Sequence, residues 1–311
     1  MWRNPVAQAL SQTDTLILDG ALATELEARG CNLADTLWSA KVLMENPELI
    51  YQVHYDYFAA GAHCAITASY QATPQGFAQR GLDEAQSRAL IQQSAALAQR
   101  ARDDYRAASG TNAPLLVAGS IGPYGAFLAN GAEYRGDYAL PAAEMKAFHR
   151  PRVAALLEAG VDLLACETLP SFAEAQALVS LLAEFPDSSA WFSFTLRDAN
   201  HISDGTPLST VAALLNASPQ VVAVGINCVA LENVTPALRS LQALCTQPLL
   251  VYPNSGEQYD ATSKTWHSAP SGCTLHDKFP EWQQAGARLI GGCCRTTPQD
   301  IAAIAACCQP Q

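Results

Sequence analysis

Eight short apolar runs recur along the chain, and this repeat constrains the fold more than any other feature. The runs cover residues 15–20, 64–69, 115–120, 162–168, 191–195, 221–228, 248–253 and 288–294. Longer stretches rich in alanine and leucine, with helical spacing, separate them. Eight is the number of parallel strands that closes a barrel. The sequence therefore predicts an α/β fold, a single (β/α)8 TIM barrel domain over residues 1–311, with the active site at the C-terminal ends of the strands.

Helices are expected between these strands. The predicted helices cover residues 47–60, 82–108, 145–159, 172–185 and 231–244. Several inter-strand segments end in Ala-Gly just before a strand, at Gly61, Gly160 and Gly286. Glycine allows the left-handed backbone conformation that stops a helix, so each of these residues is expected to end one.

Charge and composition narrow the class of protein. The formal net charge of -11 would repel nucleic acid and anionic membranes, so neither is expected as a partner. The first ten residues lack the apolar core of a signal peptide, and no later run is long enough to span a bilayer. A cytoplasmic location is expected. The ten cysteines are not spaced like a secreted disulfide framework, so reduced thiols are expected, some as ligands and others in the core.

The last residues of the eight runs are expected to meet at one mouth, because the C-terminal ends of barrel strands converge there. The strand-end residues are Asp19, Gly20, Thr67, Ser69, Ser120, Glu167, Thr168, Thr195, Asn227, Cys228, Tyr252, Cys293 and Cys294. Three cysteines and two carboxylates thus share the predicted mouth.

Cys228, Cys293 and Cys294 form a soft ligand set that suits Zn²⁺. Three protein ligands leave one coordination position open, which is typical of catalytic rather than structural zinc. Neighbouring residues of a regular strand point to opposite faces, so Cys293 and Cys294 can share an ion only where the chain leaves strand geometry. Gly291 and Gly292 are expected to supply that freedom. The alternative is that these cysteines are small buried apolar residues.

Structural roles are expected for the remaining cysteines, which are Cys31, Cys64, Cys166, Cys245, Cys273, Cys307 and Cys308. The adjacent pair Cys307 and Cys308 lies near the end of the last helix, with no strand end or glycine beside it. Cys166 is turned away from the side that Glu167 uses, by strand alternation.

Asp19 and Glu167 leave three interpretations open. They could act as a general acid and base, hold the ammonium group of an amino-acid substrate, or cap the helices that follow them. No histidine falls at a strand end, which argues against a histidine-ligated hydrolase. Two long loops, residues 122–140 and 254–280, follow the third and seventh strands and are expected to form substrate walls or lids.

Motifs along the whole chain resemble one known family. LDGALATELEARG, ITASYQA, GSIGPYGA, ACETLP, GINC, YPNSGE and GGCCRTTP occur in that order. Together they are similar to the homocysteine S-methyltransferases, and GINC with GGCC is the most specific feature. The resemblance is closest to the bacterial enzymes that use S-methylmethionine.

The resemblance implies a Zn²⁺ ion held by Cys228, Cys293 and Cys294, onto which the homocysteine thiolate binds. Asp19 and Glu167 would bind the substrate's amino group, and Asn227 would line the site. The implied reaction transfers a methyl group from a sulfonium donor, S-methylmethionine or S-adenosylmethionine, to homocysteine and yields methionine. Relatives that use betaine carry an aromatic residue at the position of Thr168, so betaine is not expected as the donor.

Aromatic residues near the mouth are candidates to contact a cationic sulfonium. They are Tyr70, Phe77, Tyr124, Tyr134 and Tyr138.

Two other classes of function remain open from the residues alone. One is a barrel hydrolase that uses Asp19 and Glu167, and the other is a zinc-binding protein without catalytic activity.

Overall fold

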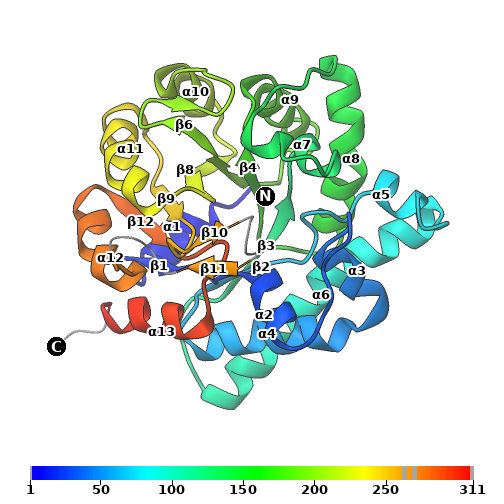
Figure 1. Ribbon diagram of the computed structural model, residues 1–311, viewed down its shortest axis with the longest axis horizontal. Coiled ribbons are helices and arrows are strands. Elements are labelled where there is room, and N and C mark those ends of the chain that lie inside the picture. The colour runs from blue at the N-terminus through cyan, green and yellow to red at the C-terminus, as the bar shows by residue number, and fades with distance from the viewer. Residues whose placement is uncertain (1, 261–264, 268–271, 309–311) are drawn as a thin grey trace.

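The computed structural model describes residues 2–260, 265–267 and 272–308. Eight strands form a central ring that helices surround (Figure 1). The ring strands are β1 (Leu16–Ile17), β2 (Cys64–Ile66), β3 (Leu116–Ile121), β4 (Leu163–Leu169), β5 (Ala190–Phe194), β8 (Val221–Asn227), β9 (Leu249–Tyr252) and β12 (Ala287–Ile290). Each lies within or overlaps one of the eight predicted runs, so the predicted strands are confirmed.

All neighbouring strands of the ring are parallel, in the order β1-β12-β9-β8-β5-β4-β3-β2. The ring closes where β1 meets β2, because the Asp19 N–H donates to the Cys64 carbonyl at 3.0 Å and the His63 N–H donates to the Ile17 carbonyl at 2.7 Å. The predicted TIM barrel is therefore confirmed. Two hairpins lie outside the ring, β6 (Leu196–Asp198) with β7 (His201–Ile202) and β10 (Gln258–Asp260) with β11 (Thr265–His267).

The helices, in chain order, are α1 (Pro5–Leu10), α2 (Leu22–Ala28), α3 (Ser39–Glu45), α4 (Pro47–Ala59), α5 (Pro74–Ala78), α6 (Glu84–Ser109), α7 (Tyr124–Phe127), the 3-10 turn η1 (Ala132–Tyr134), α8 (Ala142–Glu158), α9 (Phe172–Leu182), α10 (Leu208–Asn216), α11 (Leu231–Leu244), α12 (Leu275–Gln284) and α13 (Pro298–Ala306). The five predicted helices are confirmed as α4, α6, α8, α9 and α11, and further helices accompany them. Gly61, Gly160 and Gly286 take φ of 105°, 80° and 100° just after α4, α8 and α12, as expected for residues that stop a helix.

Strand alternation divides the apolar residues into two cores. Ile17 packs in the layer between the strands and the outer helices, whereas its neighbours Leu16 and Leu18 point into the barrel. Val6 and Ala9 of α1 belong to this interior core. Helix α1, which the sequence analysis did not predict, therefore closes the amino-terminal end of the barrel. Asn4 caps it by accepting a hydrogen bond from the Ala7 N–H at 2.9 Å.

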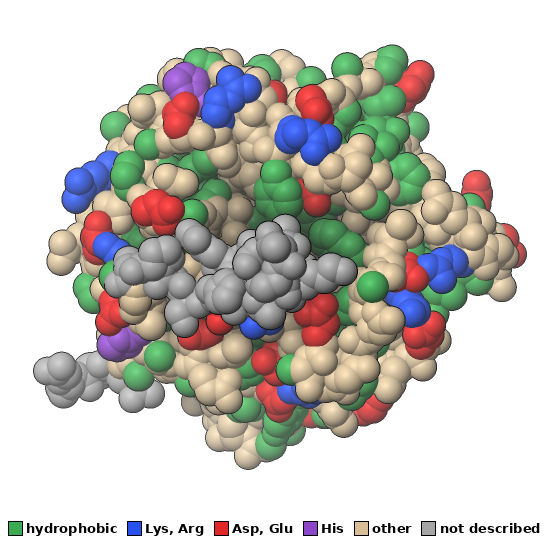
Figure 2. Space-filling model, viewed as in Figure 1, with side chains coloured by type: hydrophobic (Ala, Val, Ile, Leu, Met, Phe, Trp, Pro, Cys, Tyr) green, Lys and Arg blue, Asp and Glu red, His purple; other side chains and the backbone are tan. Residues whose placement is uncertain are grey.

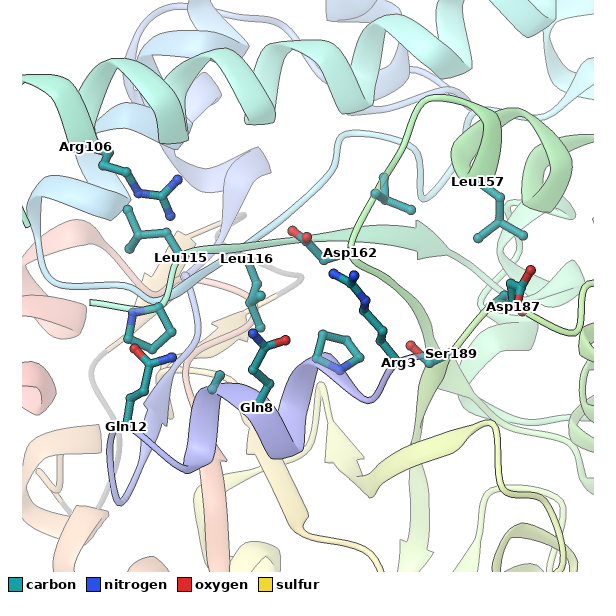
Figure 3. Close-up of a pocket in the computed structure, with 15 residues that line it drawn as sticks. Arg3, Gln8, Gln12, Arg106, Leu115, Leu116, Leu157, Asp162, Asp187 and Ser189 are labelled. Carbon is teal, nitrogen blue, oxygen red and sulfur yellow. The ribbon is translucent and has the colours of Figure 1, made fainter. Parts of the chain in front are cut away.

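A cleft of about 450 Å³ lies beside α1 at this closed end (Figure 3). Arg3, Gln8 and Gln12 face it from the amino-terminal segment, and Arg106 and Asp162 face it from the other side. No predicted site residue lines this cleft. In the part of the chain that the structure describes, we find no helix with the length and apolar character needed to span a bilayer.

Candidate metal centre and substrate cleft

A second cleft, of about 190 Å³, opens at the carboxyl ends of the strands. In the space-filling view, hydrophobic and acidic side chains surround a hollow near the centre of the face (Figure 2). All six predicted site residues line the cleft: Asp19, Glu167, Asn227, Cys228, Cys293 and Cys294. They come from β1, β4, β8 and β12 or from the residues just after them. The barrel thus brings together residues that lie up to nearly the full length of the chain apart, as the convergence of strand ends predicts.

The sulfur atoms of Cys228, Cys293 and Cys294 lie within 4.8 Å of one another. Among the described residues, this is the one group of three or more Cys, His, Asp or Glu side chains with the spacing of a metal site. Cys228 and Cys293 are joined as a disulfide, with their Cα atoms 5.5 Å apart, and Cys294 is a free thiol. At this pair the structure differs from the expected reduced thiols, because the barrel mouth brings the two sulfurs into contact.

Gly291 and Gly292 allow the cysteines to converge, but not for the predicted reason. Strand β12 ends at Ile290, so Cys293 and Cys294 do lie outside strand geometry. Neither glycine has a positive φ. Space is what they provide: a Cβ atom at Gly291 would lie 2.8 Å from the Asp19 carbonyl oxygen, and one at Gly292 would collide with the Thr296 side chain. Glycine here lets the chain pass close to β1 and to Thr296.

Asp19 and Glu167 both line the cleft, from the ends of β1 and β4, and are almost completely buried. Burial raises the pKa of Asp19 well above its usual range. The Ile66 N–H donates to Oδ2 at 2.9 Å, which lowers this pKa in part. The negative charge of Glu167 raises it further. Burial also raises the pKa of Glu167, while hydrogen bonds from Ser120 and Tyr252 (2.9 Å) lower it.

The structure gives Asp19 no role as a helix cap. Helix α2 has Ala21 at its N-cap, without a side-chain cap. Two carboxylates in one cleft, whose charged forms burial disfavours, create a strong local demand for positive charge. No Lys, Arg or His occurs among the described residues that line the cleft. The arrangement is suited to a cationic group of a ligand.

Asn227 lines the cleft, but its side-chain amide forms hydrogen bonds with other residues of the protein. Its Oδ1 accepts hydrogen bonds from the Thr168 N–H at 2.8 Å and from Ser193, and its Nδ2 donates to the Thr168 hydroxyl at 2.8 Å. Thr168 has a φ of 58°, which is costly for a β-branched residue. Asn227 therefore holds the strained end of β4, directly after Glu167.

Left-handed backbone at non-glycine residues concentrates around the cleft. Trp38, Thr168 and Cys228 line it and have φ of 46°, 58° and 51°, and Arg295 (66°) follows the cysteine pair. Ala129 (53°), in the loop after β3, is the one other described residue of this kind. Each such conformation costs on the order of 1 kcal/mol, and such strain typically occurs where function fixes side-chain position.

The five aromatic candidates divide into two groups. Tyr70 and Tyr134 line the cleft. Phe77 is buried in the core, and Tyr124 and Tyr138 pack against each other with ring centroids 5.6 Å apart. These three rings pack within the protein, and none of them is among the residues that line the cleft.

Tyr124 and Tyr138 instead fasten the loop that follows β3. The Tyr124 N–H donates to Glu174 of α9 at 2.8 Å, and the Tyr138 hydroxyl donates to the other oxygen of the same carboxylate. Buried Arg152 donates to the carbonyls of Tyr70 at 2.6 Å and Gly122 at 2.7 Å. The loop 122–140 is thus held near both ends, and it places Tyr134 on the cleft as predicted for a substrate wall.

Sequence reasoning missed Trp38. Its ring stacks on Tyr70, with centroids 6.0 Å apart and planes within 11°, and both residues line the cleft. Trp38 precedes α3 and is not at a strand end, so no strand pattern marked it. The other long loop, 254–280, lies partly outside the described residues, since 261–264 and 268–271 are not described.

The cysteines assigned structural roles lie away from the cleft. Cys166 and Cys64 are buried in the outer and the interior core respectively. None of the other seven cysteines lines the cleft.

Comparison with known proteins tests the family suggested by the motifs. The family model described as homocysteine S-methyltransferase matches residues 16–308. The chain belongs to the homocysteine S-methyltransferase family. This membership confirms the predicted enzyme class, a methyltransferase, and sets aside the hydrolase and the non-catalytic zinc protein.

Relatives of the same family match nearly the whole chain. Homocysteine S-methyltransferase of Escherichia coli strain K12 is 66% identical over 97% of this chain and 98% of its own length. Homocysteine S-methyltransferase YbgG of Bacillus subtilis strain 168 is 54% identical over 97% of both chains. The crystal structure of the metallated form of the homocysteine methyltransferase MmuM from Escherichia coli has a TM-score of 0.90 at 63% identity, covering 97% of this chain and 99% of that one.

Proposed function

We propose that this homocysteine S-methyltransferase transfers a methyl group from a sulfonium donor to the thiolate of L-homocysteine, giving methionine, with Zn²⁺ as cofactor. S-methylmethionine is the proposed donor, with S-adenosylmethionine as a second one. The observation that supports this most is the placement of three convergent cysteines beside two buried acids in one cleft. The relatives, which are homocysteine S-methyltransferases, support homocysteine as the acceptor.

Cys228, Cys293 and Cys294 are the proposed ligands of the ion. Three sulfur donors fit Zn²⁺ by softness and number, and their reduced, deprotonated forms are required. When bound, Zn²⁺ supplies an open coordination position at which the pKa of an incoming thiol falls. The existence of a metallated form of MmuM supports a metal cofactor.

Asp19 and Glu167 are proposed to bind the ammonium group of homocysteine. An ammonium ion placed between the two buried carboxylates would offset the burial that raises the pKa of both. Ser120 and Tyr252 hold the Glu167 carboxylate, and the Ile66 N–H holds that of Asp19. Asn227 contributes to the wall and fixes Thr168. These residues would orient the substrate thiol toward the three cysteines.

Trp38, Tyr70 and Tyr134 are proposed to form the wall against which the donor binds. An aromatic face attracts a sulfonium cation without forming an ion pair. The reaction joins a thiolate and a sulfonium into two neutral thioethers, so charge disperses in the transition state. Aromatic walls that exclude water therefore favour the reaction more than a hydrated site would.

The test uses purified, reduced protein loaded with one equivalent of Zn²⁺. Homocysteine is incubated with S-methylmethionine and, separately, with S-adenosylmethionine, and methionine is measured by mass spectrometry. We expect methionine from S-methylmethionine at a rate that falls when a chelator removes the metal. Absence of methionine with both donors, at full zinc content, would reject the proposed reaction.

Two further expectations remain proposals. We infer that residues 1–311 form one homocysteine-binding domain, which the family match over residues 16–308 supports. We also infer a cytoplasmic enzyme whose partners are its small-molecule substrates, without nucleic acid or membrane. The net charge of -11 supports the latter.

A further inference from the structure

Glu133 is a buried acid beside the cleft that the proposed mechanism does not use. It lies in η1, in the loop 122–140, and is 4% exposed. Its Oε2 atom has no hydrogen-bond partner among the residues that the structure describes. Burying a carboxylate oxygen without a partner is costly, so such an atom in a folded protein calls for a ligand.

The position of Glu133 is fixed from two sides. Its carbonyl oxygen accepts a hydrogen bond of 3.1 Å from the Thr195 hydroxyl, directly after β5. The loop that carries it is fastened to α9 through Tyr124 and Tyr138. The next residue, Tyr134, lines the cleft. Glu133 is therefore held at the rim of the cleft rather than on a free loop.

The negative charge of Glu133 acts on groups that line the cleft. It contributes to the raised pKa of Tyr70, Tyr134 and Cys294, each mainly raised by burial. Burial raises the pKa of Glu133 itself, and the Arg135 charge opposes this only in part. The Arg135 guanidinium donates instead to Asp137 and to the Asn130 carbonyl, both at 2.8 Å. The carboxylate thus lies close enough to Tyr70, Tyr134 and Cys294 for its charge to act on them, and its neighbour Tyr134 lines the cleft.

We infer that Glu133 binds the α-ammonium group of the S-methylmethionine donor and so selects a donor that is an amino acid. This inference rests on the proposed function. Asp19 and Glu167, at the strand ends, are already assigned to the ammonium group of homocysteine. Glu133 lies on the loop beside Tyr134, which belongs to the proposed donor wall. Each substrate would then have its own acidic partner.

The chemistry of the reaction favours the donor's ammonium over its sulfonium as the partner of Glu133. The sulfonium charge disappears as the methyl group moves, so an ion pair with it would stabilise the donor more than the transition state and slow the reaction. The ammonium charge is the same before and after transfer. A carboxylate can therefore hold it without raising the barrier, and its effect should be on KM rather than on kcat.

The test compares Glu133→Gln with the parent enzyme, using S-methylmethionine and 4-(dimethylsulfonio)butanoate, the same sulfonium without the amino group. With S-methylmethionine, we expect KM to rise about tenfold to a hundredfold, the range for one charge-assisted hydrogen bond, with kcat within about twofold of the parent. The KM for homocysteine should not change. With the amino-free sulfonium, measured as substrate or as competitive inhibitor, the variant and the parent should not differ.

Glu144→Gln, the same change at an exposed position of α8, is the matched control and should behave like the parent. An equal loss with both sulfonium compounds, or a rise in KM for homocysteine, would overturn the assignment. Glu133→Asp keeps the charge and should recover part of the affinity for S-methylmethionine. Failure to recover any, in a variant that melts like the parent, would indicate a role in packing instead.

The parent enzyme provides a test that needs no variant. It should bind S-methylmethionine at least about tenfold more tightly than the amino-free sulfonium, measured by calorimetry. Equal affinities would reject the inference while leaving methyl transfer intact. If the parent forms no methionine at all, the proposed function fails, and the calorimetric comparison still decides the role of Glu133.

Discussion

Two pairs of adjacent cysteines, Cys293–Cys294 and Cys307–Cys308, have the same local chemistry but different surroundings. The first follows β12 at the barrel mouth, within 4.8 Å of a third cysteine just after β8. The second lies just after α13, where Cys307 is exposed and donates weakly to the Ala303 carbonyl, and Cys308 packs partly against the outer core. Two thiols in sequence do not make a ligand site. A third ligand, brought by another strand, is what distinguishes the mouth pair.

The largest difference between the two cysteine pairs, in zinc content and in methyl transfer, should appear when a thiol at the barrel mouth is removed. In Cys228→Ser, Cys293→Ser or Cys294→Ser, we expect zinc content to fall from about one per chain to near zero, because three ligands are the minimum for holding the ion at an open site. Methyl transfer should fall by about a thousandfold or more, since loss of a ligand exceeds the tenfold to hundredfold typical when a residue that only orients a ligand is changed. Elemental analysis and turnover measure the two effects. Full zinc and turnover in any variant would remove that cysteine from the site.

A smaller effect on activity should come from changing an acid of the cleft. Acids of this kind line the cleft with Cys293–Cys294 but do not accompany Cys307–Cys308. Glu167→Gln keeps the shape but removes the charge proposed to meet the homocysteine ammonium, worth roughly 1.5 to 3 kcal/mol. We expect about a tenfold to hundredfold loss of kcat/KM at unchanged zinc content. The loss should shrink for a homocysteine analogue without the amino group, which makes the measurement a double-mutant cycle. Equal losses with both thiols would mean that Glu167 does not hold the ammonium.

The burial of Asp19 should be visible in stability. Its pKa is raised above the ordinary value of 3.8, so the folded protein keeps a proton that the unfolded chain has lost. Stability should therefore fall as pH rises from about 4 through the folded pKa. At neutral pH, Asp19→Asn should stabilise the metal-free, substrate-free protein by on the order of 1 kcal/mol, and the gain should shrink at lower pH. Urea denaturation of both proteins across pH measures it. A gain that is constant with pH would point to a cause other than ionisation.

The smallest effect on zinc content, turnover and stability is expected at Cys307–Cys308. Cys307→Ser and Cys308→Ser should keep parental zinc content and turnover, and change the free energy of unfolding by about 0.5 kcal/mol or less, as surface substitutions usually do. Elemental analysis and thermal melting test this. If either variant lost zinc, the division between the two cysteine pairs would be wrong.

The strands and the mouth residues could be predicted because they depend on local pattern. Alternation and run length mark each strand, and parallel closure then fixes which residues converge, so the sequence alone could place Asp19, Glu167 and Cys228 at the mouth. Helix α1 could not be predicted from local pattern alone, since its two buried residues gain their partners only once the barrel interior exists. The spatial role of Gly292 depends on Thr296 folding back toward it.

Trp38 and Glu133 escaped prediction for a related reason. Each lies in an irregular segment away from the strand ends. Trp38 reaches the cleft through its stack on Tyr70, and Glu133 through a loop that Glu174 fastens from a neighbouring helix. These positions follow from contacts between distant segments, which residue spacing does not encode.

The loop 122–140 also bears on how such an enzyme can change. The proposed metal ligands and the acids proposed for the acceptor sit at the ends of β1, β4, β8 and β12, where any shift disturbs the barrel itself. The groups proposed for the methyl donor include Glu133 and Tyr134, which belong to the single loop 122–140, held by Glu174 and Arg152. The residues of such a loop can be replaced or randomised together, while the residues that hold its two ends stay unchanged. Donor preference should therefore be able to evolve, or be engineered, while the chemistry at the sulfur stays untouched.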